Sequence, residues 1–210
     1  NFAEALRLYE SFDKPTPTMQ RIHTRILFGR AIEYINKGQY AEANNLLDKV
    51  IKDPLPGKAL PFAYFWKGEI AYRQNRFEDA ILNLNRYLQY QAVEGEATPH
   101  NARYSLGYSY LQTDNFPKAY ENFNKVSPRI TATSSSMQQD AYVRSADALY
   151  MQKNYATAKT MYQNVINLGL PQSDYSLYQL ALIAGINNQP EKIRTFNKLV
   201  EQYPNSELVP

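Results

Sequence analysis

A short pattern of residues recurs along the chain at a nearly constant spacing. In each copy a turn residue precedes an aromatic residue, and two spacer residues separate the aromatic residue from a small one. The aromatic residues, which lie 37 to 39 positions apart, are Phe2, Tyr40, Phe77, Phe116 and Tyr155. A sixth copy has Gln189 in the aromatic position, 34 residues after the fifth. A period of this length is typical of a unit of two helices that cannot bury both its faces alone, so neighbouring units must stack.

Each copy continues with the spacing of an amphipathic helix. Large apolar residues follow the small residue after four and seven positions, as Leu47 and Val50 follow Ala43, and such residues line one helix face. Upstream lies a second amphipathic stretch. In four copies a small residue stands nine positions before the aromatic one: Ala31, Gly68, Gly107 and Ala146. Because closely crossing helices leave no room for a side chain, we interpret both sets of small residues as helix contacts. The Asn or Gly near each aromatic residue indicates a left-handed turn between the helices.

We therefore predict an all-α fold of eleven helices, with one leading helix followed by five antiparallel pairs. An irregular helical bundle is the alternative, but a bundle does not require a fixed small-to-large register in five copies. The predicted units are a half repeat at 1–17 and repeats at 18–56, 57–96, 97–133, 134–171 and 172–210.

Composition excludes several kinds of chemistry. The chain has no Cys and only two His among its 210 residues, so thiolate and His-rich metal sites are excluded. The formal net charge is only +3 and no two Lys or Arg residues are adjacent, which does not favour a nucleic-acid partner. No phosphate-binding Gly-rich loop occurs, and the longest apolar run, near Leu180–Ile186, is too short to cross a membrane. We expect no cofactor, no metal, no membrane-spanning segment and no enzymatic activity.

The third copy carries the best match to a known repeat, through Gly107, Tyr110, Phe116, Ala119 and Phe123. This spacing resembles the tetratricopeptide repeat family across essentially the whole chain. The resemblance implies a right-handed superhelix, or solenoid, of helix pairs whose first helices line a concave groove for protein partners. The chain departs from the family in two ways. Most copies are longer than the family's repeat, and Lys192 stands where a small residue is expected.

The segment 191–206, which ends in Tyr203-Pro204-Asn205-Ser206, resembles repeats of bacterial cell-envelope tetratricopeptide proteins. Examples are the Tol–Pal-associated division coordinator and the lipoprotein of the outer-membrane β-barrel assembly machine. This resemblance implies a periplasmic or outer-membrane-associated protein with an envelope protein as its partner. Because Phe2, Leu6 and Tyr9 would need an upstream neighbour, we also expect the chain to be a segment of a longer array.

The family's geometry selects the residues that we expect in the groove. The candidates for partner binding are Phe65, Glu69, Tyr72, Arg73, Tyr104, Tyr108, Asp147 and Tyr150. The same geometry also selects Phe28, Ile32 and Val143. Tyrosine suits an interface because it combines apolar area, a hydroxyl group and little rotamer entropy. In the alternative interpretation, longer helices turn these residues into the core between repeats. We interpret Trp66 as a core residue.

The function that these observations favour is a non-enzymatic scaffold that binds a peptide segment or helix of a partner protein. One alternative is a glycan-capture module, in which aromatic side chains stack on sugar rings. The other is a structural spacer with no groove ligand. Glu69 and Asp147 are two repeats apart, so we interpret them as ordinary carboxylates and not as a catalytic pair.

Overall fold

The computed structural model describes residues 1–55 and 57–209, and within them it contains eleven α-helices and no strand. The predicted all-α fold is confirmed. Pro56 and Pro210, where predicted repeat boundaries fall, lie outside the described residues. The helices are α1 Phe2–Glu10, α2 Pro17–Asn36, α3 Tyr40–Lys52, α4 Ala59–Arg73, α5 Phe77–Leu88, α6 Pro99–Gln112, α7 Phe116–Val126, α8 Ser136–Met151, α9 Tyr155–Asn167, α10 Ser173–Ala184 and α11 Gln189–Gln202.

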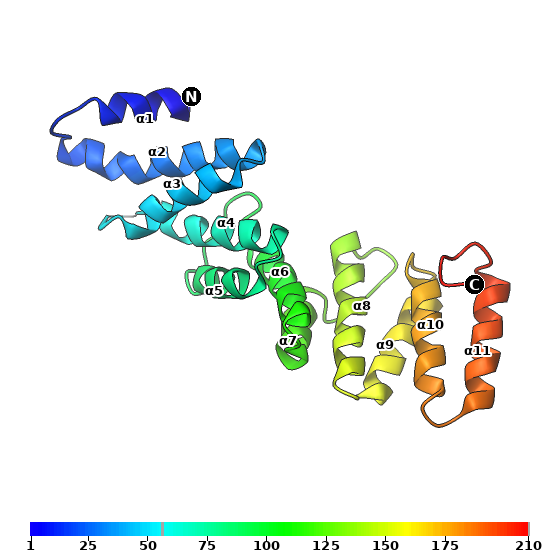
Figure 1. Cartoon of the computed structure of the whole chain (residues 1–210). Coiled ribbons are helices and arrows are strands. Elements are labelled where there is room, and N and C mark those ends of the chain that lie inside the picture. The colour runs from blue at the N-terminus through cyan, green and yellow to red at the C-terminus, as the bar shows by residue number, and fades with distance from the viewer. Residues whose placement is uncertain (56, 210) are drawn as a thin grey trace. The chain divides into compact units, whose positions relative to one another are not determined.

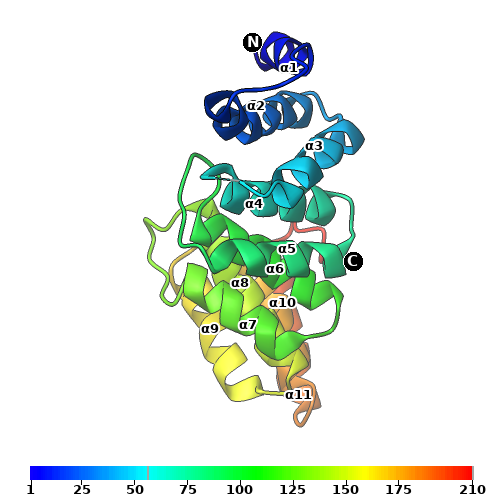
Figure 2. The ribbon, with the colours of Figure 1, turned by 90° about the vertical axis from the view of Figure 1, so that its left-hand side faces the viewer.

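The chain forms two compact units, residues 1–109 and residues 110–210, and the boundary in the sequence falls within α6. In the first unit each helix from α1 to α5 packs on the next one, and α2 also contacts α4. In the second unit the same succession runs from α7 to α11. Figures 1 and 2 show this order as neighbouring helices in each unit. Stability in such a stack comes from contacts between neighbouring helices.

The small residues mark helix contacts, as predicted. The alanines of the register are completely buried: Ala31, Ala43, Ala80, Ala119, Ala146 and Ala158. At Gly68 on α4 an added Cβ would lie 2.5 Å from Cγ of Leu84 on α5, closer than real Cβ atoms approach other atoms. The large apolar residues that follow the small ones fill the core, among them Leu47, Leu84, Phe123 and Tyr162.

Left-handed residues close the first helix in four pairs. Gly38, Asn75, Asp114 and Lys153 have φ of 71°, 57°, 55° and 61°, and each stands two positions before the aromatic residue. The last pair differs, because α10 ends at Ala184 and the residue that caps it, Gly185, has φ of −63°. An added Cβ on Gly185 would lie 2.7 Å from Cδ of Lys192. The glycine therefore makes room for the large residue that replaces the expected small one.

Replacing Lys153 with glycine is expected to stabilise the second unit by about 0.5–1 kcal/mol. A non-glycine residue in the left-handed region costs about 1–2 kcal/mol, whereas glycine costs about 0.5–1 kcal/mol of chain entropy. Gly38→Ala is the reciprocal control, because an added Cβ there meets nothing within 4 Å and only the backbone preference changes. Denaturant unfolding followed by circular dichroism should show a higher free energy of unfolding for Lys153→Gly and a lower one for Gly38→Ala. Loss in Lys153→Gly would contradict the argument.

Candidate functional site

Two adjoining hollows lie between α2, α4 and the loop that follows α5. The first, here called the Lys58 hollow, measures about 420 Å³ and is lined by Ile22, Thr24, Arg25, Phe28, Gly57, Lys58, Ala59, Phe62 and Glu94. The second, the Trp66 hollow, measures about 310 Å³ and is lined by Phe28, Ile32, Asn36, Phe62, Trp66 and the loop residues 94–97. They share Phe28, Phe62 and Glu94 and therefore form one continuous depression on the first-helix face of the unit.

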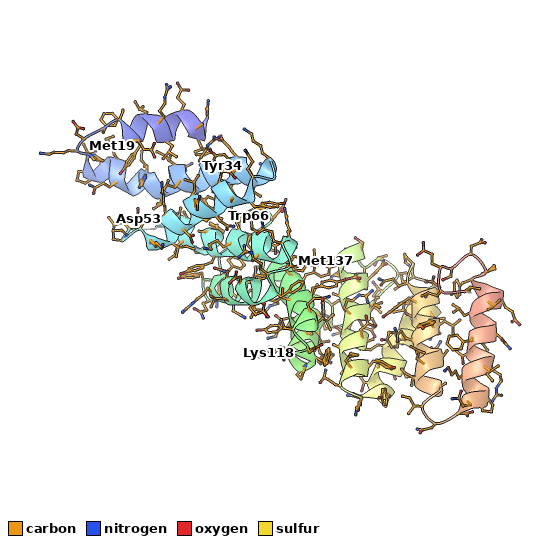
Figure 3. All side chains as sticks on the ribbon, in the orientation of Figure 1. Met19, Tyr34, Asp53, Trp66, Lys118 and Met137 are labelled. Carbon is orange, nitrogen blue, oxygen red and sulfur yellow. The ribbon has the colours of Figure 1, made fainter. Side chains whose placement is uncertain are left out.

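Side chains one helical turn apart build the apolar floor of this depression. Phe28 and Ile32 lie four residues apart on α2, and Phe62 and Trp66 lie four residues apart on α4. Residues at this spacing are neighbours on one helix face. The rings of Phe28 and Phe62 meet with their centroids 6.2 Å apart. Figure 3 marks Trp66 on α4, where its half-buried indole ring packs against the core of the unit and also faces the hollow.

The loop 89–98 forms the remaining wall. Figures 1 and 2 show it in green, reaching past α4 toward α2. Its start is fixed by the Tyr87 hydroxyl, which donates to the carbonyl of Ala92. Its end is fixed by backbone hydrogen bonds between Glu94 and Ala97, of 2.9 and 3.1 Å. The repeat pattern does not predict this wall, in which Gly95 turns the chain with φ of 54°.

Four charged side chains line the depression. Arg25 and Lys58 belong to the Lys58 hollow, Glu96 belongs to the Trp66 hollow and Glu94 to both. All four residues are exposed, and none forms an ion pair with another described residue. The site therefore presents an apolar floor between a cationic end and an acidic wall.

Glu69 lies on α4, one turn beyond Trp66, and is largely buried. Burial raises the pKa of its carboxyl group above the ordinary value of 4.5, against the opposing effects of a hydrogen bond with Ser105 and the charge of Arg73, while Glu96 raises it further. Its Oε1 is buried without a hydrogen-bond partner among the described residues. The Arg73 guanidinium carbon lies 5.9 Å from the centre of the Trp66 ring. Glu69 is thus a desolvated acid beside the Trp66 hollow.

The raised pKa of Glu69 predicts a pH dependence of stability. Its neutral form is favoured in the fold, so its stabilising contribution is complete below pH 4.5 and is lost as pH rises through the pKa of the folded state. The wild type should therefore lose stability relative to Glu69→Gln between pH 4.5 and neutrality. Urea unfolding followed by fluorescence of Trp66, the single Trp of the chain, measures this difference. The exposed-carboxylate control, Glu78→Gln, should show no such trend, and a parallel pH profile for Glu69→Gln would refute the prediction.

The structure places the predicted groove residues of the first unit in different environments. Phe65 is only 1% exposed and packs edge-on against Tyr87, so it offers no surface to a partner. The prediction that Phe65 lines the groove is therefore wrong. Tyr108 contacts both Tyr72 and Tyr104, with ring centroids 6.3 and 5.2 Å apart, and all three side chains are half-buried. Arg73 is exposed. For Glu69, Tyr72, Arg73, Tyr104 and Tyr108, contact with a partner stays a prediction.

In the second unit, Val143 is buried and Asp147 is the centre of a polar network. Asp147 Oδ1 accepts hydrogen bonds from the hydroxyls of Tyr162 and Tyr175, at 2.6 and 3.0 Å. Its Oδ2 accepts from Arg144. Only 15% of the Asp147 side chain is exposed, so its oxygen atoms serve the packing of α8, α9 and α10 and it is not an open groove contact.

Tyr150 is half-buried, and its ring contacts that of Tyr155 with centroids 5.5 Å apart. Contact of Tyr150 with a partner also stays a prediction. Burial, and then the Asp147 carboxylate, raise the pKa of Tyr175 to about 12, so this hydroxyl keeps its proton and remains a donor near neutral pH.

Within residues 1–55 and 57–209, no helix combines the length and the apolar character that crossing a membrane requires. The same residues contain no group of three or more His, Cys, Asp or Glu side chains arranged to hold a metal ion.

Comparison with known proteins identifies the repeat. Two family models, both described as tetratricopeptide repeat, match residues 28–97 and residues 140–168 and 175–206. Residues 98–139, which contain the copy that best fits the consensus by inspection, lie outside these matches. No curated protein matches the chain.

Solved structures share the fold. MamA 41-end from Desulfovibrio magneticus RS-1 superposes with a TM-score of 0.66 at 14% identity, over 88% of this chain and 97% of that chain. A tetratricopeptide repeat protein from Parabacteroides merdae ATCC 43184 gives 0.66 at 15% identity, over 87% and 68%. The C-terminal part of a protein with these repeats from Cytophaga hutchinsonii gives 0.59 at 18% identity, over 96% and 74%. The matched repeats make up more than half of the sequence, and the chain belongs to the tetratricopeptide repeat family.

Proposed function

We propose that the chain is a non-enzymatic scaffold that holds a peptide segment of a partner protein across the Lys58 and Trp66 hollows. The observation that carries the proposal is the continuous depression between α2 and α4, with an aromatic floor of Phe28, Phe62 and Trp66. Binding sites are concave, mostly apolar and furnished with a few polar groups, as this depression is. Tetratricopeptide repeats are generally protein-interaction modules, which supports a protein as the ligand.

The glycan alternative is less favoured by the surroundings of Trp66. Sugar rings stack on an open aromatic face. One side of the indole here is covered by the Arg73 guanidinium, and Phe65 packs edge-on against it at 5.3 Å. The floor is therefore better suited to aliphatic and aromatic side chains than to a sugar ring.

The envelope location is also a proposal, and it rests on the resemblance of residues 191–206. Cell fractionation of the parent organism with an antibody against the chain tests it. Recovery with the periplasmic or outer-membrane fraction is expected, and recovery with the cytosolic fraction would refute it.

Peptide binding can be tested through Trp66, because the single indole of the chain lines the second hollow. Peptides of about twelve residues selected from a random display library should change its fluorescence emission. Phe28→Ala should weaken these peptides about 30-fold, equivalent to about 2 kcal/mol, because it removes part of the floor. Leu82→Ala, at a 60% exposed position on α5, is the matched control and should leave the affinity unchanged. Failure to enrich any peptide, or equal affinity for Phe28→Ala, would overturn the proposal.

A further inference from the structure

The partner segment can be defined further from the charges around the depression, an inference that rests on the proposed function. We infer that the segment is bipolar. It carries a carboxylate that pairs with Arg25 and Lys58 and a cationic side chain that pairs with Glu94 and Glu96, with bulky apolar residues between them.

The cationic end is built by two elements. Arg25 comes from α2, and Lys58 directly precedes α4, so the two side chains converge on the Lys58 hollow. Both residues are exposed, and neither forms an ion pair with a described residue. A guanidinium and an ammonium group at the mouth of an apolar hollow favour a carboxylate, because charge-assisted hydrogen bonds are stronger where water is partly excluded.

The acidic wall carries the opposite charge. Glu94 and Glu96 flank Gly95 in the loop, and their residues line the Trp66 hollow without an ion-pair partner among the described residues. Glu96 lies close enough to the buried Glu69 to disfavour its ionised form. The carboxyl groups of Glu69 and Glu96 are therefore close together beside the Trp66 hollow, whereas Glu94 borders both hollows. A cation bound there reduces their mutual repulsion.

The length of the depression sets the length of the segment that it can hold. Both α2 and α4 run from the Lys58 hollow to the Trp66 hollow, as Arg25 and Asn36 of α2 line the first and the second. Eleven positions of a helix span about 16 Å, at about 1.5 Å for each residue. An extended peptide covers this distance with about five residues. An extended segment of about five residues, with apolar side chains over Phe28 and Phe62, therefore spans the depression from Arg25 to Asn36.

Charge reversal tests the inference. Peptides from the random library should carry an acidic residue, an apolar centre and a basic residue. The double variant Arg25→Glu/Lys58→Glu should bind them at least 10-fold more weakly. Synthetic peptides in which the acidic residue is replaced by Lys should bind this double variant more tightly than the wild type. Arg86→Glu, an exposed charge reversal on α5, is the control and should change neither affinity nor selection.

The outcomes separate this inference from the proposed function. Enrichment of apolar peptides without acidic residues, with affinities that charge reversal does not change, overturns the bipolar segment but leaves peptide binding intact. No enrichment of any peptide removes the proposed function itself. Self-association of the chain that Arg25→Glu/Lys58→Glu abolishes would assign the depression to a second copy and would also overturn the inference.

Discussion

Replacing Asp147 with alanine should lower the free energy of unfolding of residues 110–210 by about 3 kcal/mol, because the change removes an acceptor from one buried donor and from two half-buried ones. The hydroxyls of Tyr162 and Tyr175 both donate to Asp147 Oδ1, and Arg144 donates to Oδ2. Tyr162 is completely buried and cannot turn to water. Arg144 retains a contact with Asp140 at 3.3 Å, which keeps the loss below that of a fully orphaned charge.

Two probes resolve this effect within one experiment. Circular dichroism follows the helices of both units, whereas Trp66 fluorescence follows the unit of residues 1–109. Asp147→Ala should therefore shift the dichroism transition more than the fluorescence transition. Asp147→Asn keeps an acceptor for the tyrosine hydroxyls and should lose less stability than Asp147→Ala. The control Glu201→Ala, at an exposed position on α11, should leave the stability almost unchanged. If Asp147→Ala unfolds like the wild type, the network does not stabilise the unit.

The fold could be predicted from the sequence because one requirement repeats in every pair. A helix crossing requires a small residue, and the residues four and seven positions later must be large and apolar to fill the core. Ala80 and Leu84 therefore show the same pattern as Ala119 and Phe123. Turns follow a local rule of the same kind, since in four pairs the left-handed position stands two residues before the aromatic one.

The candidate site could be predicted only in part, because facing side chains need not hold equivalent places in the repeat. The ring of Phe28 contacts that of Phe62, which lies 34 positions later in the chain. The position equivalent to Phe28 in the next repeat is, however, that of Phe65, 37 positions later. Side chains at consecutive positions of a helix point about 100° apart. A residue assigned to a position one or a few places away can therefore face the core and not the groove. Phe65 was placed wrongly for this reason, and Trp66, interpreted as core, also lines the hollow.

Non-repeating features had no periodic signal at all. The loop 89–98 forms a wall through Glu94 and Glu96, and the link between α7 and α8 at the equivalent place does not repeat its sequence. Asp147 is a groove candidate from its place in the repeat, but the tyrosines that hold it come from α9 and α10, and no local pattern connects them. Contacts between distant residues of this kind are determined by packing, which the sequence period does not describe.

Replacing Gly68 with leucine should lower the free energy of unfolding of the first unit by about 3 kcal/mol. An added Cβ would lie 2.5 Å from Cγ and 2.7 Å from Cδ2 of Leu84, and 3.2 Å from its backbone nitrogen. A side chain can move aside for a methyl group, but the longer leucine meets the backbone of α5 and must push the helices apart. Gly68→Ala should cost much less, because alanine regains about 1 kcal/mol of helix propensity over glycine.

A double-mutant cycle identifies the cause of this loss. Leu84→Ala alone should cost about 2–5 kcal/mol by leaving a cavity. Combined with Gly68→Leu it should cost less than the sum of the two changes, because the new side chain fills the space that Leu84 leaves. Ala41→Leu, at an exposed position on α3, controls for the added leucine and should be neutral in Trp66-monitored unfolding. Additive losses would show that Gly68 and Leu84 do not share one contact, and the small-residue register would then lose its physical basis at this crossing.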